Sequence, residues 1–495
     1  MSLSHAEFRV VLASILSALF LAALDQTIVA TALPSIAADL GNFDLLSWVV
    51  TSYLLTATCS TPILGKLSDI YGRPLLLNIA LVTFLVGSVI CALAPDMLSL
   101  IGARALQGIG GGALITLVQA IIGDLVSPRD RGRYIAYFAS VWATAAVAGP
   151  TLGGFLTATV GWHWIFWINV PIGLVVLLVV HRVLRRVPFP RRPARIDYGS
   201  ILLFTIGSTA LLLAVTWGGV AHPWLSAWVL GAFLAAILAG GAFLFRQART
   251  GEPILPLHYF SDDVIGRVLP TVFLIFGGYL SLVVLIPTYL QVARQVSVAE
   301  VGLLLIPLTL SAPVAASITG RHMRRTGDYK RPPLVGIPVS CAALLVMAIW
   351  ASSLSPLTAA GLLVLVGLGL GTTFPTSLLA VQNAAHPREM GTATGALAFF
   401  RALGGATVTA ALSALLLGLV VVRLPEIGGV AGLEDLVRQP LAPADRAIVA
   451  NAFSVVFLAI LALFAASWVI FLKVGVRPLR DHTGHHHAEG AEASA

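Results

Sequence analysis

Two charged residues lie inside stretches that are otherwise apolar. Asp25 falls within LAALDQTIVATALP, residues 21–34, in an apolar run that starts near Phe8. Arg104 lies in another such run, and Gln107 follows it at a spacing that puts both side chains on one face of a helix. At the centre of a bilayer a charged side chain costs about 2.5 to 3.5 kcal/mol on insertion scales. If these stretches cross a membrane, Asp25 must be paired, protonated or in contact with water.

Asp25 is the one acidic residue, of 22 in the chain, that we place deep in an apolar stretch. Asp69, Asp124 and Asp130 fall at the ends of such stretches. A carboxylate whose solvation changes can take up and release a proton. Arg104 is the candidate counter-charge, because it also lies inside an apolar stretch. The alternative is a fixed ion pair of Asp25 with a cation that holds two helices together.

The composition indicates that these stretches do cross a membrane. Of 495 residues 58% are hydrophobic and 11% are charged, whereas about 25% of residues in soluble domains are charged. Apolar windows of roughly 20 residues, the length that spans a hydrocarbon core, recur along the whole chain. We count fourteen windows and predict an all-α polytopic membrane protein.

The basic residues indicate the orientation of these helices. Most of the 30 Lys and Arg residues fall in loops on the side that carries the N-terminus, including the run RVLRRVPFPRRPAR at 182–195. Loops rich in Lys and Arg stay in the cytoplasm, so both termini are expected to be cytoplasmic. The same rule explains the net charge of +8 with the lipid bilayer as partner and without nucleic acid.

Two pairs of similar loops indicate an internal duplication. GKLSDIYG at 65–72 has the same glycine spacing as GRHMRRTG at 320–327, and VSPRDRG at 126–132 resembles AHPREMG at 385–391. Both pairs are separated by nearly the same number of residues, as in transporters built from repeated halves. Charge is concentrated in the first half, because Leu363 stands at the position equivalent to Arg104.

The duplication predicts four segments, of which two are six-helix bundles. They are an N-terminal bundle at 1–190, an inserted helix pair with linkers at 191–260, a C-terminal bundle at 261–475, and a disordered cytoplasmic tail at 476–495. The tail contains HTGHHHAEG at 482–490, which we interpret as part of the disordered tail rather than as a metal site. The three cysteines lie in apolar stretches without metal-ligand spacing, and no metal site is expected.

Four motifs resemble those of the major facilitator superfamily, and specifically of its fourteen-span drug:proton antiporter family. They are LDQTIVATALP at 24–34, GKLSDIYGRP at 65–74, RALQGIGGG at 104–112 and AGPTLGGFL at 148–156. The resemblance covers nearly the whole chain. It implies a major facilitator fold of two six-helix bundles plus two inserted helices.

The resemblance also implies roles for particular residues. Asp25 and Arg104 would couple transport to protons. The second motif would form a cytoplasmic gate of Gly65, Asp69, Gly72 and Arg73. The fourth would be the antiporter motif, with Gly149, Pro150, Gly153 and Gly154. In the closed gate Asp69 is expected beside residues 391–394, and the alternative for the second motif is a static loop. For the glycines of the third motif, Gly108, Gly110, Gly111 and Gly112, the alternative is plain packing.

A substrate cavity between the halves is harder to read from the sequence. Its candidate residues are polar or aromatic side chains of the apolar stretches: Gln26, Trp48, Tyr53, Gln107, Trp142, Tyr279, Phe374, Phe399, Phe400 and Arg401. The aromatic members could instead face lipid, whereas an intramembrane arginine is expected to face the bundle interior. GWHWIFWINVP at 161–171 is interpreted as an aromatic belt at the outer interface.

These features predict a proton-coupled antiporter of the cell (inner) membrane that confers drug resistance. It would export amphipathic, cationic drugs or toxic compounds from the cytoplasm by alternating access, and it would work as a monomer without a cofactor other than protons. The alternative is an exporter of lipids or anionic metabolites on the same scaffold. Enzyme function is not expected, because the chain has no H-E-x-x-H or G-x-S-x-G motif and no second buried carboxylate.

Overall fold

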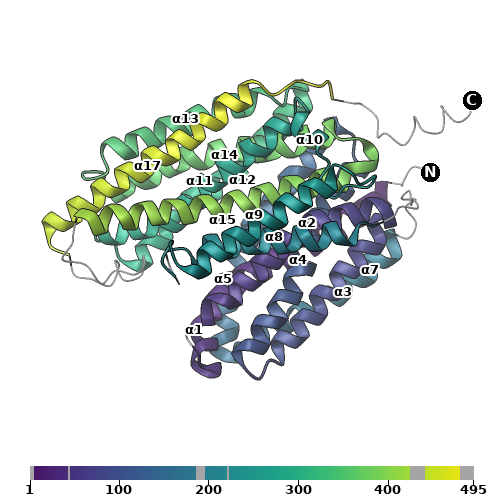
Figure 1. The fold of residues 1–495 in the computed structure, drawn as a ribbon, viewed down its shortest axis with the longest axis horizontal. Helices are drawn as coiled ribbons and strands as arrows, with labels where there is room; N and C mark the ends of the chain where they lie inside the picture. Colours follow the sequence, from purple (N-terminus) through teal and green to yellow (C-terminus); the bar gives the residue numbers. More distant parts are fainter. Residues whose placement is uncertain (1–4, 43–44, 185–195, 220–221, 424–440, 480–495) are drawn as a thin grey trace, which may run out of the picture.

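The computed structural model describes residues 5–42, 45–184, 196–219, 222–423 and 441–479, and these residues form helices joined by turns and loops. Figure 1 shows two groups of long helices, purple to blue and green to yellow, that meet at the end where α1 begins and α17 ends. Most of the basic run at 182–195 and the His-rich stretch at 482–490 lie outside the described residues.

The first group of helices comes from the N-terminal part of the chain. Its helices are α1 (His5–Leu40), α2 (Leu46–Tyr71), α3 (Arg73–Ala92), α4 (Met97–Leu125), α5 (Pro128–Thr159), α6 (Trp164–Trp167) and α7 (Asn169–Leu184). The main packing pairs are α2 with α4, α3 with α4, and α1 with α5. Helix α4 is therefore the centre of this group, and most of its side chains are buried.

The second group repeats this packing with the equivalent helices. It contains α11 (Ile265–Thr288), α12 (Val298–Thr326), α13 (Arg331–Ile349), α14 (Pro356–Ala384), α15 (Met390–Arg423) and α17 (Pro443–Leu472), with a π-helical turn η2 (Tyr289–Ala293) and a 3-10 turn η3 (Pro387–Glu389). Its main pairs are α12 with α14, α13 with α14, and α11 with α15. The domain boundaries near residues 190, 260 and 475 stay a prediction.

Two further long helices lie between the groups in sequence. They are α8 (Tyr198–Trp217) and α9 (Ala227–Gln247), which pack on each other, and the short α10 (His258–Ser261) follows them. Helix α8 also contacts α2 of the first group and α15 of the second, and it lies across them in Figure 1. The inserted pair therefore covers the seam between α2 and α15.

Among the described residues, thirteen helical segments are long and apolar enough to span a membrane. Helix α2 is not one of them, because its sequence includes Ser, Thr, Lys and Asp along with its apolar residues. It is nevertheless as long as the others and is packed between α4 and α15, and most of its polar residues are buried. With α2 the number matches the fourteen spans predicted, and the all-α polytopic fold is confirmed.

Glycines of α4 allow α2 to approach its backbone closely. A Cβ added at Gly108 would collide with the Thr56 hydroxyl and the Tyr53 carbonyl, and one at Gly112 would collide with the Ala57 carbonyl. Small residues that let helix backbones touch are the usual packing device in membranes, where hydrophobicity does not drive helices together. Tyr53 is held beside Arg104 by this contact.

We expect Gly108→Ala to lower the melting temperature of the detergent-solubilised protein by several degrees. The added methyl forces α2 away from α4, and overpacking of this kind costs about 1 to 3 kcal/mol. The control is Gly102→Ala on the same helix, where a Cβ meets open space and the better helix propensity of alanine is free to act. Equal melting temperatures for the two variants would contradict the packing argument.

Candidate functional site

Asp25 is buried at the centre of the first helix group, with none of its surface exposed. The Arg104 Nη1 donates to its Oδ2 at 2.6 Å, the Gln107 Nε2 donates to its Oδ1 at 2.9 Å, and the Asn169 Nδ2 donates to the same Oδ1 at 3.0 Å. Both carboxylate oxygens are therefore satisfied by donors from α4 and α7. The structure brings together the two residues that the sequence predicts as the proton-coupling pair.

Arg104 is held in place by contacts besides the ion pair. Its Nε donates to the Val49 carbonyl at 3.2 Å, its Nη1 also donates to the Gln107 Oε1 at 2.7 Å, and its guanidinium lies 4.2 Å from the centre of the Tyr53 ring. A cation over an aromatic face gains free energy when both are out of water. The guanidinium is thus fixed from α2 as well as from its own helix.

Ser88 and Asn169 complete this network, and the sequence prediction missed both. The Ser88 hydroxyl accepts hydrogen bonds from Gln107 at 3.1 Å and from Asn169 at 3.0 Å, and donates to the Phe166 carbonyl at 3.0 Å. Asn169 follows a run of large apolar residues. An amide in such a setting needs a buried partner, and this signal could have revealed it.

The segment at 161–171 is not simply an aromatic belt. Trp162 and Phe166 are buried, and the Trp162 Nε1 donates to the Asp39 Oδ2 at 2.8 Å. Trp164 is about half exposed and fits the predicted interfacial position. The interpretation as a belt is wrong for the two buried rings, because α6 packs against α1 and α3.

The predicted antiporter motif packs α5 against the helix that carries Asp25. A Cβ at Gly149 would collide with the Thr27 hydroxyl, and one at Gly153 would collide with the Thr31 hydroxyl. The Thr27 hydroxyl donates to the Ala145 carbonyl at 2.9 Å. Two glycines of the motif therefore set the distance between α1 and α5. The other two members differ, since Pro150 is exposed and Gly154 faces open space.

Arg401, on α15, lies among aromatic rings of the second group. Its guanidinium carbon is 5.0 Å from the Phe374 ring centre and 5.5 Å from that of Phe276, and Tyr279 lies beside Phe276 with ring centres 6.1 Å apart. Of the predicted cavity residues, Phe374 thus lies beside Arg401, and Tyr279 is linked to Arg401 through Phe276, which was not predicted. Phe276 could have been found from its spacing, since it is one helical turn before Tyr279.

The other predicted cavity residues are dispersed. Phe399 contacts Phe204 of α8 with ring centres 5.0 Å apart, Phe400 contacts Phe260 of α10 at 6.0 Å, and Trp48 contacts Trp217 of α8 at 5.6 Å. Gln26 and Trp142 are partly buried on α1 and α5. The structure therefore places three of these rings against the segment between the two groups.

Asp69, at the end of α2, binds the first turn of α15. The amides of Gly391 and Thr392 donate to its carboxylate at 2.9 and 2.7 Å, and the Thr392 hydroxyl donates at 2.6 Å. A helix N-terminus presents free N–H groups and a partial positive charge to an anion. The carboxylate lies where the sequence places it, and its action as a gate stays a prediction.

The remaining residues of the gate motif shape this contact. Arg73 pairs with Asp69 at 2.6 Å and with Asp124 at 2.8 Å. The Asp69 carboxylate is therefore held by Arg73 as well as by the first turn of α15. Gly72 has a φ of 92°, a backbone conformation that only glycine adopts readily, and it makes the turn between α2 and α3. A Cβ at Gly65 would collide with the Gly391 carbonyl.

The two groups are joined at this end by several other contacts. The Gln382 Nε2 donates to the Gln119 carbonyl at 3.0 Å, and Gly132 of α5 meets Gly320 of α12 backbone to backbone. One buried apolar cluster includes residues of both groups, whereas the two clusters that contain Trp162 and Tyr289 each belong to one group. The described core is therefore continuous between the groups only at the end where α1 begins.

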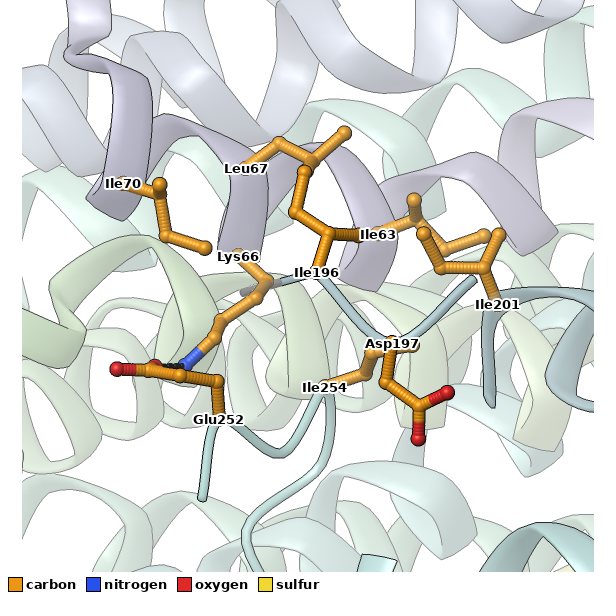
Figure 2. A pocket seen from close by; sticks show the side chains of 9 residues that line it. All are labelled: Ile63, Lys66, Leu67, Ile70, Ile196, Asp197, Ile201, Glu252 and Ile254. Carbon is orange, nitrogen blue, oxygen red and sulfur yellow. Dashed lines mark hydrogen bonds and ion pairs between the residues drawn. The ribbon is translucent and has the colours of Figure 1, made fainter. Parts of the chain in front are cut away.

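Figure 2 shows a small pocket beside the gate, between the end of α2 and the loops that flank the inserted helices. Lys66 points across it to Glu252, with an Nζ to Oε2 distance of 2.6 Å. Asp197 caps α8 through the Ser200 amide at 3.1 Å, and a hydrogen bond from Arg246 lowers the pKa of Asp197 to about 2. Isoleucine and leucine make up most of the remaining wall, so the pocket ties the inserted pair to α2.

Comparison with known proteins agrees with this arrangement. The sequence profile of the Major Facilitator Superfamily matches residues 15–409. An uncharacterised MFS-type transporter of Mycobacterium tuberculosis (strain ATCC 25618 / H37Rv) is 34% identical over 97% of this chain and 71% of that protein. The multidrug transporter protein MdtP of Bacillus subtilis (strain 168) is 32% identical over 78% of this chain and 71% of its own length.

A similar fold occurs among solved structures. The crystal structure of a bacterial homologue of the iron transporter ferroportin, in an outward-facing state, superposes with a TM-score of 0.65 over 94% of this chain and 100% of that one. The sequences are 14% identical, so the likeness concerns the fold alone.

We expect a charge-neutralising double variant to be more stable than either single variant of the buried pair. Asp25→Asn leaves the Arg104 charge uncompensated and Arg104→Gln leaves the Asp25 charge uncompensated, and breaking a buried pair costs about 3 to 5 kcal/mol. The double variant Asp25→Asn/Arg104→Gln removes both charges. Thermal unfolding followed by size exclusion compares the four proteins, and additive losses would mean that the two charges do not interact.

We expect Asp69→Asn to reduce the population of molecules closed at the gate end. The amide loses the attraction to the α15 N-terminus, which contributes about 0.3 to 1 kcal/mol at exposed helix ends and up to about 2 kcal/mol when partly buried. Spin labels on cysteines replacing Tyr71 and Arg388 would report longer distances. Asp130→Asn, in the first turn of α5, is the matched control and keeps the wild-type distances; an unchanged distribution in Asp69→Asn would remove the gate argument.

Proposed function

Because this chain belongs to the major facilitator superfamily of membrane transporters, we propose that it is a proton-coupled antiporter that exports amphipathic compounds by alternating access. The observation that carries the proposal is the fully buried Asp25–Arg104 pair at 2.6 Å. The relatives are transporters and not enzymes, and the chain is a multi-pass membrane protein. The proposal concerns the coupling ion, the direction and the substrate.

Membership of the fourteen-span drug:proton antiporter family is part of this proposal. It is supported by α2 and the thirteen apolar helical segments, and by the contact of Gly149 and Gly153 with α1. The relative MdtP is named a multidrug transporter, which supports export of toxic compounds. We place the protein in the cell (inner) membrane with both termini cytoplasmic, because the Lys and Arg residues concentrate on that side.

The proton step rests on the burial of the pair. In the closed arrangement at the gate end, Arg104, Gln107 and Asn169 donate hydrogen bonds to the Asp25 carboxylate and hold α1 against α4 and α7. Protonation would remove the attraction for Arg104 and loosen α1 from α4. A proton entering from the outside would thus change the packing of the first group, and its release to the cytoplasm would restore the pair.

In this mechanism the remaining residues hold other groups in place and do not themselves carry the proton. Gln107, Asn169 and Ser88 orient the carboxylate, while Asp69 and α15 close the cytoplasmic end when the site faces outward. All of these groups come from one chain, so we propose a functional monomer. Protons are the coupling ion, and the proposed mechanism uses no other cofactor.

Two classes of exported compound are candidates, cationic compounds and lipids or anionic metabolites. A cationic substrate would need a free carboxylate, but the Asp25 oxygens are already engaged by Arg104, Gln107 and Asn169. Arg401 favours the second candidate, an exporter of lipids or anionic metabolites, because its positive charge lies among aromatic rings.

We expect removal of the titratable group at position 25 to abolish proton-driven transport. Proteoliposomes under an imposed pH gradient would be tested with ethidium, a cation, and with 1-anilinonaphthalene-8-sulfonate, an anion. Wild-type protein should move at least one dye, whereas Asp25→Asn and the neutral double variant Asp25→Asn/Arg104→Gln should fall to the level of protein-free vesicles.

The control for this test is Asp96→Asn. Asp96 caps α4 through the Ser99 amide at 2.8 Å, and asparagine caps equally well, so transport should persist. Gradient-driven transport at the wild-type rate by the Asp25→Asn protein would overturn the proposal. Loss of folding is monitored by size exclusion, and the double variant separates it from loss of coupling.

A further inference from the structure

Arg401 of α15 differs from the paired charges of the first helix group. Asp25 is matched by Arg104, and Asp69 and Asp124 share Arg73. Arg401 is the exception, since no carboxylate in the part of the chain that the structure describes forms an ion pair with it. A lone guanidinium in a membrane helix is costly and marks a place where a charge or water must come from outside.

Arg401 lies on α15 at a distance from the contact that closes the gate end. It is only partly buried, and it lies ten residues along α15 from Gly391, which is about 15 Å at the rise of an α-helix. Gly391 belongs to the closed contact with Asp69. Arg401 therefore lies beyond the closed end, on a helix that packs against α2 of the first group.

The surroundings of Arg401 leave its hydrogen-bonding capacity free. Phe374 and Phe276 lie within 5.5 Å of the guanidinium carbon, and these rings can fix the cation without taking its donors. Among the described residues we find no hydrogen bond from Arg401 to another side chain or to a carbonyl. A planar fork of N–H donors suits a carboxylate or sulfonate, which it binds through two parallel hydrogen bonds.

We propose that Arg401, with Phe374, Phe276 and Tyr279, binds the anionic group and adjoining ring of the exported compound, so that the substrates are amphipathic aromatic anions. This inference rests on the proposed export function and names its substrate class. The guanidinium pairs with the carboxylate or sulfonate, and the rings contact the apolar part. The neutral Asp25–Arg104 pair in the first group neither attracts nor repels the ligand strongly, which leaves Arg401 to select the charge.

The test compares three ligands that share one ring system. They are 2-naphthoate, the neutral 2-naphthamide and the cationic 2-naphthylmethylammonium, titrated into purified full-length protein by calorimetry at neutral pH. We expect naphthoate to bind tightest to the wild type. Arg401→Gln should weaken naphthoate binding about tenfold to a hundredfold, the loss typical of a hydrogen bond to a charged group, and leave naphthamide unchanged.

Two variants control this measurement. Arg401→Lys keeps the charge but not the fork, and should recover part of the naphthoate affinity. Arg331→Gln removes an arginine with a largely exposed side chain and should bind all three ligands as the wild type does. Intact naphthamide binding by Arg401→Gln shows that the variant is folded.

The proposal is overturned if wild-type protein prefers the amide or the cation, if no naphthalene ligand binds, or if Arg401→Gln retains full naphthoate affinity. Binding needs no pH gradient, so the result is independent of proton coupling. If Asp25→Asn transports at the wild-type rate while Arg401→Gln loses naphthoate, only the coupling proposal fails. If Asp25→Asn is uncoupled while Arg401→Gln binds naphthoate normally, only the substrate class fails.

Discussion

The packing of the first helix group depends on the ion pair of Asp25 and Arg104, which are 2.6 Å apart and both buried. Removing two charges from water costs several kcal/mol per ion, and their attraction offsets this cost only if the remaining donors and acceptors are satisfied. Gln107 and Asn169 donate hydrogen bonds to the carboxylate, Ser88 accepts from both amides, and the ring of Tyr53 lies beside the guanidinium. Helices α1, α2, α3, α4 and α7 must all be in register for the network to form.

The gate end uses the opposite strategy, since its charge is held by backbone as well as by side chains. Asp69 accepts from two amides of α15, and these contacts form only when α2 lies against that helix. Glycines at 65 and 391 allow this approach. Contacts that need two helix groups in one position are lost together when the groups move, whereas the network around Asp25 stays inside one group. The Asp25 carboxylate is thus held within one helix group, whereas the Asp69 carboxylate joins the two groups.

The parts of this arrangement that could be predicted from the sequence are those in which a charged residue lies in or beside an apolar stretch. Asp25, Arg104 and Asp69 are charges in or beside apolar helices, and the position of Asp69 followed from the motif it belongs to. Partners without charge were harder to find: Ser88 and Asn169 are ordinary in isolation, and Trp162 and Phe166 looked interfacial because ring content does not tell which face is buried. The Lys66–Glu252 pair joins residues far apart in the chain, and no local pattern indicates it. The domain boundaries and the roles of the predicted site residues stay predictions.

Helix α8 has a consequence for molecules that are dissolved in lipid. It lies against α2 and α15, so that one of the two seams between the helix groups has the inserted pair in front of it, while α5 and α12 pack directly on each other at the other. A compound that partitions into the bilayer before it reaches the protein therefore meets two unequal flanks. Lateral entry or escape between α2 and α15 would have to pass the inserted helices, whereas at the other seam it would have to separate α5 from α12.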